Sequence, residues 1–401
     1  MSHKPGVYRS GAVYPVAAGR AAVRSTAMSV RIVLAAFAFT IVLSAQARGG
    51  QRPAVDLEAL PYAPRTVVCH RTALPLAVDG RLDEPAWQAV PWSAPFVDID
   101  GVRPVRHLTQ MKVLWDDRAL YIAARLDEPD VWATITTRDA VIFQDDDFEV
   151  FLDPGGDTHE YYELEVNALG TAWDLFLVKP YRDGGPALHA WDIAGLAVGV
   201  DVRGTINRPG DRDEGWTVEL ALPWDILREA SPGRRAPRDG EQWRLNVSRV
   251  EWTMDVIDGM YRKRVDPTSR KALPEDNWVW SPQGAIDMHM PERWGVVQFS
   301  DAIAGTREVA VLPDGNDLVK WALRRLYYRQ RSYRATHGHY AIDLEALRAG
   351  DVRADGLSFS PSLHASPHSY QITAAGVDGS LVHIANDGKV WVTRHSAVRR
   401  P

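Results

Sequence analysis

The sequence of 401 residues has a single cysteine, Cys69, so no disulfide can form within the chain. Of the two interpretations of this residue, a reactive thiol or a packed apolar side chain, we favour packing. Blocks of lysine and arginine are also missing, and the net charge of −6 is mild for this length. A nucleic-acid surface needs a basic patch, so we expect no binding to nucleic acid.

The short motifs of several enzyme classes are absent as well. The chain has no G-x-S-x-G elbow, no H-E-x-x-H zinc motif, no Walker loop and no dinucleotide fingerprint. A pair of carboxylates about 5 to 9 Å apart could hydrolyse a glycoside, and Glu149 with Glu165 is the candidate pair. Because acids on an open sheet face lack the enclosing cleft that raises a carboxyl pKa, a glycoside hydrolase is the less favoured interpretation.

Long apolar runs are scarce, and the one near the N-terminus is short. Residues 28–48 read MSVRIVLAAFAFTIVLSAQAR, with Arg31 before the apolar run 32–43 and a small-x-small site at 45–47. This order is typical of a secretory signal peptide, and the run is short for a membrane span; a signal anchor is the alternative. We expect a leader over 1–47 with the signal peptide at 28–47, and a start at Met28 rather than Met1. The mature chain would be secreted or periplasmic, in the cell envelope, without a membrane span.

The rest of the chain has the composition of a folded protein, with 45% hydrophobic and 24% charged residues. Residues 48–71 are rich in proline and alanine and indicate a linker or an edge segment. From 72 to 301, short runs of period-two alternation are separated by Gly, Pro, Asn and Asp. This pattern predicts a mainly β domain, an antiparallel two-sheet β-sandwich like a jelly roll, whose strands bury one face and leave the other in water.

Residues 302–401 differ in character and predict a small α+β module. An amphipathic helix is expected over 316–334, followed by the strand-like runs SYQITAAG and GKVWVTRH. The helix and the following G-x-Y-x-x-x-L pattern at Gly338, Tyr340 and Leu344 faintly resemble the globular head of type IV pilins and pseudopilins. We favour a packing or docking module, whose helix could bind a protein partner.

Two acidic runs carry the most specific pattern. In QDDDFEVFLDP (144–154) and EYYELEVNALG (160–170), apolar and acidic residues alternate, so the acids of each predicted strand share one face. A hairpin closed around PGGDTHE would set Glu149 opposite Glu165 and Asp147 opposite Asn167. Like charges placed opposite one another destabilise a sheet. A hard cation such as Ca²⁺, or the hydroxyls of a sugar, would explain why acidic residues face one another here. A solvated acidic face is the open alternative.

Six blocks of the sequence resemble the family 9 carbohydrate-binding modules in their order and spacing. They are AVDGRLDEPAWQAV (77–90), VLWDDRALYIAARL (113–126), QDDDFEVFLDP (144–154), YYELEVNALGTAWDLFL (161–177), GWTVELALPW (215–224) and WSPQGAIDMHMPERWGVVQFS (280–300). The resemblance implies a β-sandwich that binds calcium structurally. It also implies that a sugar, at the reducing end of a glucan or xylan chain, is held between two aromatic side chains.

The resemblance assigns roles to particular positions. It places the first aromatic platform on Phe143, for which plain core packing is the alternative, and the sugar-bonding acid on Glu149. The second platform falls on Met288 and His289 where the family has tryptophan, which puts tight binding of the usual ligand in doubt unless Trp278 or Trp280 replaces it. Two further residues are candidates for carbohydrate binding, Glu165 and Trp191. Four acids are expected to be calcium ligands or to hold the loop that binds calcium: Asp145, Asp146, Asp147 and Asp153.

The function predicted from the sequence is non-catalytic binding of an oligo- or polysaccharide. Fragments of plant-type xylan or glucan are the expected class, and the binding would support carbohydrate catabolism. The alternatives are an envelope scaffold that has kept the fold without binding sugar and, less favoured, a glycoside hydrolase with paired carboxylates.

Overall fold

The computed structural model describes residues 55–394. The predicted leader with its signal peptide and most of the predicted linker lie outside the described residues. Within the described residues, no helix is both long and apolar enough to cross a membrane.

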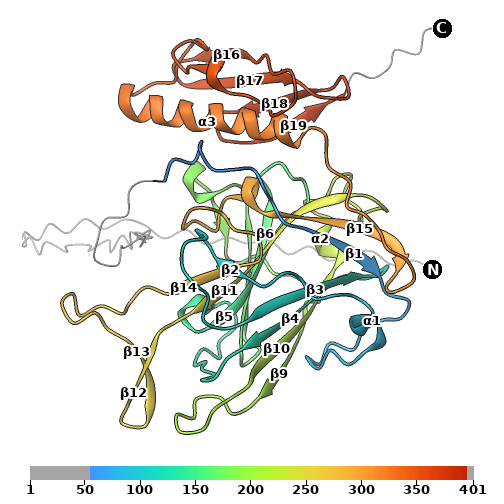
Figure 1. Ribbon diagram of the computed structural model, residues 1–401, viewed down its shortest axis with the longest axis vertical. Coiled ribbons are helices and arrows are strands. Elements are labelled where there is room, and N and C mark those ends of the chain that lie inside the picture. The colour runs from blue at the N-terminus through green and yellow to red at the C-terminus, as the bar shows by residue number, and fades with distance from the viewer. Residues whose placement is uncertain (1–54, 395–401) are drawn as a thin grey trace, which may run out of the picture. The chain divides into compact units, whose positions relative to one another are not determined.

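In the first part of the sandwich, six strands lie side by side, and each is hydrogen-bonded to the next (Figure 1). Their spatial order is β8 (Ala187–Leu188), β7 (Ala172–Leu177), β6 (Tyr161–Asn167), β5 (Asp147–Asp153), β11 (Gln242–Glu251) and β15 (Gly295–Ile303). Two short strands extend this sheet beside β11: β14 (Asp276–Val279) and β2 (Val97–Asp98).

Four strands form the second part, and one strand joins the two parts. The second part has the order β3 (Thr109–Trp115), β4 (Ala119–Asp127), β10 (Gly215–Pro223) and β9 (Ala197–Arg203). The joining strand β1 (Thr66–Arg71) runs parallel to β15 and, at its C-terminal end, to β3. The prediction that residues 48–71 are a linker or edge segment is therefore wrong for 66–71, which lie inside the strand order.

The sandwich core lies between the inward faces of these two groups of strands. Side chains from β5, β6, β11 and β15 pack in one cluster with side chains from β3, β4 and β10. The cluster follows the period-two alternation, as Phe148, Val150 and Leu152 of β5 illustrate. The fold is therefore the predicted β-sandwich. Cys69 belongs to this core and is fully buried, which agrees with a packing role.

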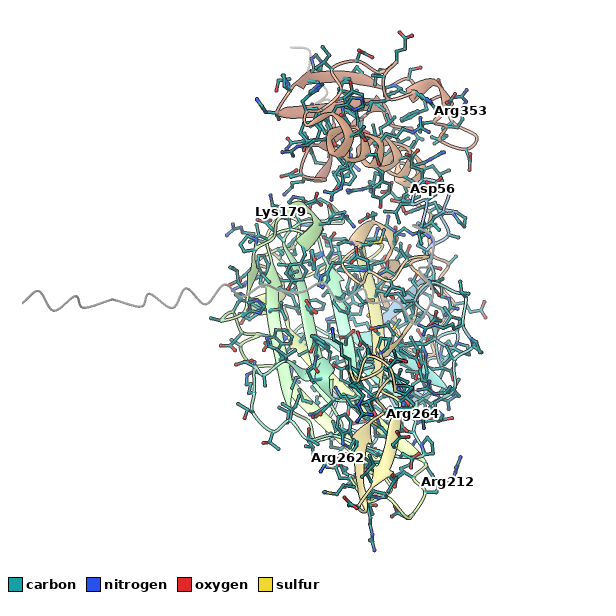
Figure 2. The ribbon with its side chains drawn as sticks, turned by 90° about the vertical axis from the view of Figure 1, so that its left-hand side faces the viewer. Asp56, Lys179, Arg212, Arg262, Arg264 and Arg353 are labelled. Carbon is teal, nitrogen blue, oxygen red and sulfur yellow. The ribbon has the colours of Figure 1, made fainter. Side chains whose placement is uncertain are left out.

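Short elements complete the sandwich. The hairpin β12–β13 extends away from the sheets, and Figure 2 labels Arg262 in β13 and Arg264 just after it. The short elements of the sandwich are α1 (Pro85–Gln88), α2 (Trp224–Leu227), η1 (Ile142–Gln144), η2 (Tyr181–Asp183), η3 (Pro291–Arg293), β12 (Met254–Ile257) and β13 (Met260–Lys263). A further 3-10 turn, η4 (Ala349–Asp351), lies in the C-terminal part.

The C-terminal residues form one helix and a four-stranded antiparallel sheet, drawn in orange and red in Figure 1. These elements are α3 (Asp317–His337), β16 (Ser362–Ser366), β17 (Ser369–Ala375), β18 (Leu381–Ala385) and β19 (Val390–Thr393). The helix covers the sheet with residues such as Leu323, Leu326 and Tyr327, which are fully buried. The helix predicted over 316–334 corresponds to α3, and the two predicted strand-like runs to β17 and β19.

Polar contacts also bind α3 to loops of the sandwich. Glu292 accepts hydrogen bonds from the Tyr328 hydroxyl of α3 at 2.5 Å and from Arg182 at 2.8 Å. Asp317 at the start of α3 forms an ion pair with Arg244 of β11 at 2.8 Å. The helix α3 therefore packs against its own sheet and is also held to the sandwich by polar contacts.

Candidate functional site

The two acidic runs form neighbouring strands in the predicted register. Glu149 of β5 pairs with Glu165 of β6, and Asp147 pairs with Asn167, which confirms the sequence-based hairpin. The row continues on both sides, because Ser248 of β11 pairs with Glu149 and Trp173 of β7 pairs with Glu165. Since directly paired residues point to the same face, these side chains line one cross-strand row on the outer face of the sheet.

This outer face is buried, not solvated. The exposed fraction is 0% for Asp147, 5% for Glu149 and Glu163, and 1% for Glu165. The expectation that each strand leaves its second face in water is wrong for β5 and β6. The reason is that Phe151 shares this face and packs with residues from η1 and from the loop before β15.

Two buried polar atoms of the row, Asp147 Oδ2 and Trp173 Nε1, have no hydrogen-bond partner within residues 55–394. Ser248 interacts with the Glu149 carboxylate, and Glu163 with Glu165. Buried polar groups without a partner cost about 1–3 kcal/mol each. The row therefore holds a buried carboxylate oxygen and an indole N–H that a ligand could satisfy.

Burial also controls the protonation of the row. It raises the pKa of Glu149 to about 7, because the charged form loses its hydration. Burial, together with repulsion from Glu149, raises the pKa values of Asp147, Glu163 and Glu165 well above the ordinary range. The ion pairs within the described residues include none from these four acids to a lysine or arginine.

Phe143 lies beside this row, in η1. Its backbone N–H donates to Glu165 Oε2 at 2.9 Å, and its carbonyl accepts from Trp252 Nε1 at 2.9 Å. Its side chain is half-buried and packs with the aromatic cluster of the outer face. Two hydrogen bonds thus fix a partly exposed aromatic ring next to the acids.

The two residues at the second platform position differ in their surroundings. Met288 is half-buried and packs in the same cluster as Phe143. His289 shares a 2.9 Å hydrogen bond with the Tyr161 hydroxyl, and its ring lies 4.6 Å from that of Tyr181. Burial and the nearby Arg182 lower the pKa of His289 to about 3, so the ring is neutral and serves packing.

The tryptophans proposed from the sequence lie elsewhere. Trp191 stacks on Tyr162 with ring centroids 5.1 Å apart, and Tyr162 points into the sandwich core, on the opposite side of the sheet from Glu149. Trp278 and Trp280 are also in that core and are 1% exposed. None of the three lies in the acidic row, so they do not replace a second platform there.

Trp173 lies at the row although the sequence did not single it out as a site residue. Its ring stacks on that of His189, with centroids 5.6 Å apart and planes 12° apart. The alternation of β7 places it on the same side as Leu175 and Leu177, and its pairing with Glu165 brings it to the row. That alternation was available in the sequence and is the signal that could have identified it.

Three of the four acids predicted to bind calcium, or to hold the loop that does, accept hydrogen bonds from loop backbone. Asp145 accepts hydrogen bonds from the Thr134 and Ile135 backbone at 2.7 Å each, and Asp153 accepts from the backbone N–H groups of the turn that follows β5. Asp146 accepts from the Trp252 backbone at 2.7 Å. Of the four acids, Asp147 is the one whose side chain joins the row.

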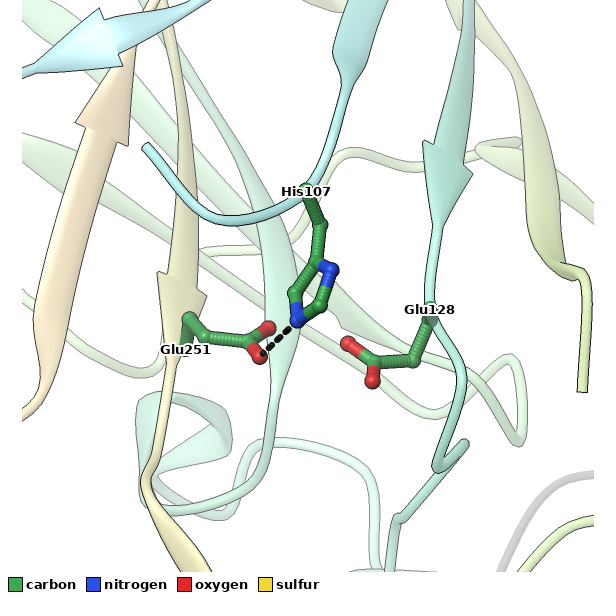
Figure 3. Close-up of side chains that lie close together, drawn as sticks. All are labelled: His107, Glu128 and Glu251. Atoms are coloured by element: carbon green, nitrogen blue, oxygen red, sulfur yellow. Dashed lines mark ion pairs between the residues drawn. The ribbon is translucent and has the colours of Figure 1, made fainter. Parts of the chain in front are cut away.

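Three groups of residues bring metal-ligand atoms within 4.8 Å of one another: Asp147, Glu149, Glu165; His107, Glu128, Glu251; Asp139, Asp174, Asp192. Figure 3 shows the second group, in which His107 Nε2 lies 3.7 Å from Glu251. Arg249 forms ion pairs with both glutamates of that group, and Arg138 with all three aspartates of the third. An arginine therefore already pairs with the carboxylates of the second and third groups.

Comparisons with known proteins identify the sandwich. A family model described as carbohydrate family 9 binding domain-like matches residues 78–300, more than half of the chain. A family 9 carbohydrate-binding module from Caldicellulosiruptor kristjanssonii in complex with cellotriose is 16% identical, with a TM-score of 0.39 over 62% of this chain and 100% of that one. The module from the same organism in complex with glucose is 15% identical, with a TM-score of 0.38 over the same shares. None of the curated proteins matches the chain.

Proposed function

Because the chain belongs to the carbohydrate family 9 binding domain-like family, we propose that it binds a saccharide, without catalysis, at the outer face of β5, β6 and β7. The observation that carries this location is the row of buried acids, in which Asp147 Oδ2 and Trp173 Nε1 have no partner within the described residues. Glu149 would accept hydrogen bonds from sugar hydroxyls, and the Trp173 indole would donate to a sugar oxygen. Phe143, half-buried at the edge of the row, would stack on the sugar ring.

The finer features of the function are part of the same proposal. We take fragments of plant-type xylan and glucan as the saccharide class, and carbohydrate catabolism as the process that the binding supports. The location would be secreted or periplasmic, as the sequence at 28–47 indicates.

Calcium is the ion that the family resemblance implies. The donors in the row fit a hard cation, since Asp147, Glu149 and Glu165 offer carboxylate oxygens within 4.8 Å of one another. A bound ion would neutralise the carboxylates there. The chain's own contribution would be to hold these oxygens on adjacent strands.

Array screening tests the saccharide class. The labelled protein is applied to immobilised cello- and xylo-oligosaccharides together with unrelated glycans, beside a Phe143→Ala variant. We expect retention on one of the first two classes and weaker retention of the variant, because the stacking face is lost. Retention that is equal for wild type and variant would remove Phe143 from the site.

Met288 and His289 favour a second candidate function, a scaffold that has kept the fold without a sugar ligand. Neither side chain offers the flat face that a tryptophan supplies, and His289 is committed to Tyr161. A folded protein that no glycan retains would support this candidate.

A glycoside hydrolase is the remaining alternative. The sequence argument against it, an open face, does not hold because Glu149 and Glu165 are buried. Family membership supports binding. We therefore expect no reducing sugar to be released from any retained oligosaccharide.

A further inference from the structure

We propose that a small cavity between α3 and the sandwich binds a monovalent anion, with chloride as the fitting ion and the Arg324 guanidinium as its main ligand. The cavity has a volume of about 20 Å³. The sandwich contributes Thr158, in the turn between β5 and β6, and Arg244 of β11, and the helix contributes Lys320 and Arg324. The lining residues differ from those of the acidic row, and no sugar is needed, so the site goes beyond the proposed function.

Arg324 is a buried cation with unused hydrogen-bond donors. Its side chain is 1% exposed, and its Nη2 donates to the Gly388 carbonyl at 2.6 Å and to the Thr158 hydroxyl at 3.2 Å. Its Nε and Nη1, which carry most of the N–H donors of a guanidinium, have no partner within residues 55–394. The Tyr327 ring, 4.7 Å from Cζ, contacts the face of the guanidinium and leaves the donors at its edge without an acceptor.

The acids in the neighbourhood of Arg324 are paired with other cations. Three acids each have an ion pair of their own at 2.8–3.3 Å: Glu292 with Arg182, Asp317 with Arg244 and Lys320, and Asp183 with Arg331. Within the part of the chain that the structure describes, Arg324 itself forms no ion pair with an acid. Because buried charges in proteins are normally paired, this guanidinium calls for an anion that the chain does not supply.

Arg244 adds a second guanidinium to the same cavity. Its Nη2 is paired with Asp317 at 2.8 Å, whereas its Nη1 has no hydrogen-bond partner among the described residues. Together with Lys320 and Arg324 it makes three cationic side chains in the lining, against the two acids Asp317 and Glu292. The lining therefore has one positive charge in excess, which a monovalent anion would balance.

The size of the cavity selects a small ion. A cavity needs about 10–15 Å³ to hold one water molecule, so about 20 Å³ admits a single small ion and excludes a phosphate or sulfate group. Chloride accepts hydrogen bonds from guanidinium N–H groups and supplies the missing negative charge. A water molecule is the competing occupant, since it fits the space and accepts hydrogen bonds but brings no charge.

Thermal unfolding in sodium chloride tests the site, with sodium gluconate as the reference salt at equal ionic strength. Gluconate is too large for the cavity and keeps the screening of surface charges constant. The proteins are wild type, Arg324→Met and, as a matched control on the same helix, Arg331→Met, which loses an exposed arginine paired with Asp183. In wild type and control, the midpoint should rise by a few degrees as chloride replaces gluconate, because the folded state binds chloride.

Arg324→Met should lack this rise, and the proposal is overturned if the variant keeps it in full or if wild type does not show it. Diffraction from wild-type crystals grown in sodium bromide is a second measurement, which decides the question even if Arg324→Met does not fold. Bromide replaces chloride and is identified by its anomalous scattering, so we expect an anomalous peak within hydrogen-bond distance of Arg324 Nε or Nη1. A cavity that holds water and no anomalous peak would overturn the proposal in favour of a hydrated arginine.

Discussion

The buried acids should make the chain less stable as pH rises from 5 to 8 when no ion is present. The ordinary glutamate pKa is 4.5, and burial raises that of Glu149 to about 7 in the folded chain. Between these values the folded state retains a proton that the unfolded state has released. The free energy of unfolding therefore falls as pH rises through this window and levels off above about pH 7.

The size of the effect follows from the same pKa difference. One pKa unit corresponds to about 1.4 kcal/mol, so Glu149 alone should account for about 3 kcal/mol between the two ends of the window. Glu149→Gln removes the titrating group and also lessens the repulsion on Asp147 and Glu165. Between the two ends of this pH window, the free energy of unfolding should therefore fall by about 3 kcal/mol less in the variant than in wild type.

Urea unfolding in chelator at pH 5 and pH 8 measures the difference. Asp153, whose pKa burial raises to about 7, contributes equally in both proteins, so the difference between wild type and Glu149→Gln reports Glu149 together with its repulsion on the neighbouring acids. If both proteins lose the same stability between pH 5 and pH 8, the buried row does not cause the pH dependence.

Three further predictions concern single side chains. Arg249→Met should destabilise the fold by about 3–5 kcal/mol in urea unfolding, because two buried glutamates lose their ion pair. Glu292 is buried, yet Arg182 holds its pKa to about 2, so stability that is present above pH 4.5 should be lost as pH falls towards 2. In Glu292→Gln, the free energy of unfolding should change less between pH 4.5 and pH 2 than in wild type. An equal change in both proteins would contradict this. Trp173→Phe should weaken saccharide binding several-fold in titration because the indole N–H donor is lost, and it should also lower the melting temperature because the smaller ring packs less well in its buried cluster.

Strand alternation was sufficient to predict the hairpin of the two acidic runs. In β5 and β6, apolar residues at every second position fixed which side chains face the core, and therefore the pairing of Glu149 with Glu165. What covers the second face could not be predicted in this way. The cover comes from η1 and from the loop around Met288, and the latter is over one hundred residues away in the chain.

Residues outside strands were harder to place. Trp191 lies in a loop, where no period relates one side chain to the next, and the structure puts it against Tyr162 on the core side. The ion pairs of Arg249 could not be predicted from the sequence either. Its neighbours Glu128 and Glu251 come from different parts of the chain, so the sequence alone could not indicate which acidic groups are neutralised.

Calorimetric titration with cello- and xylo-oligosaccharides tests the central claim most directly, using wild type, Glu149→Gln and Trp191→Phe. The account predicts saturable heat for wild type, a loss of at least about tenfold in affinity for Glu149→Gln, and unchanged binding for Trp191→Phe on the other side of the sheet. Binding that survives in Glu149→Gln and fails in Trp191→Phe would contradict a saccharide site on the acidic row.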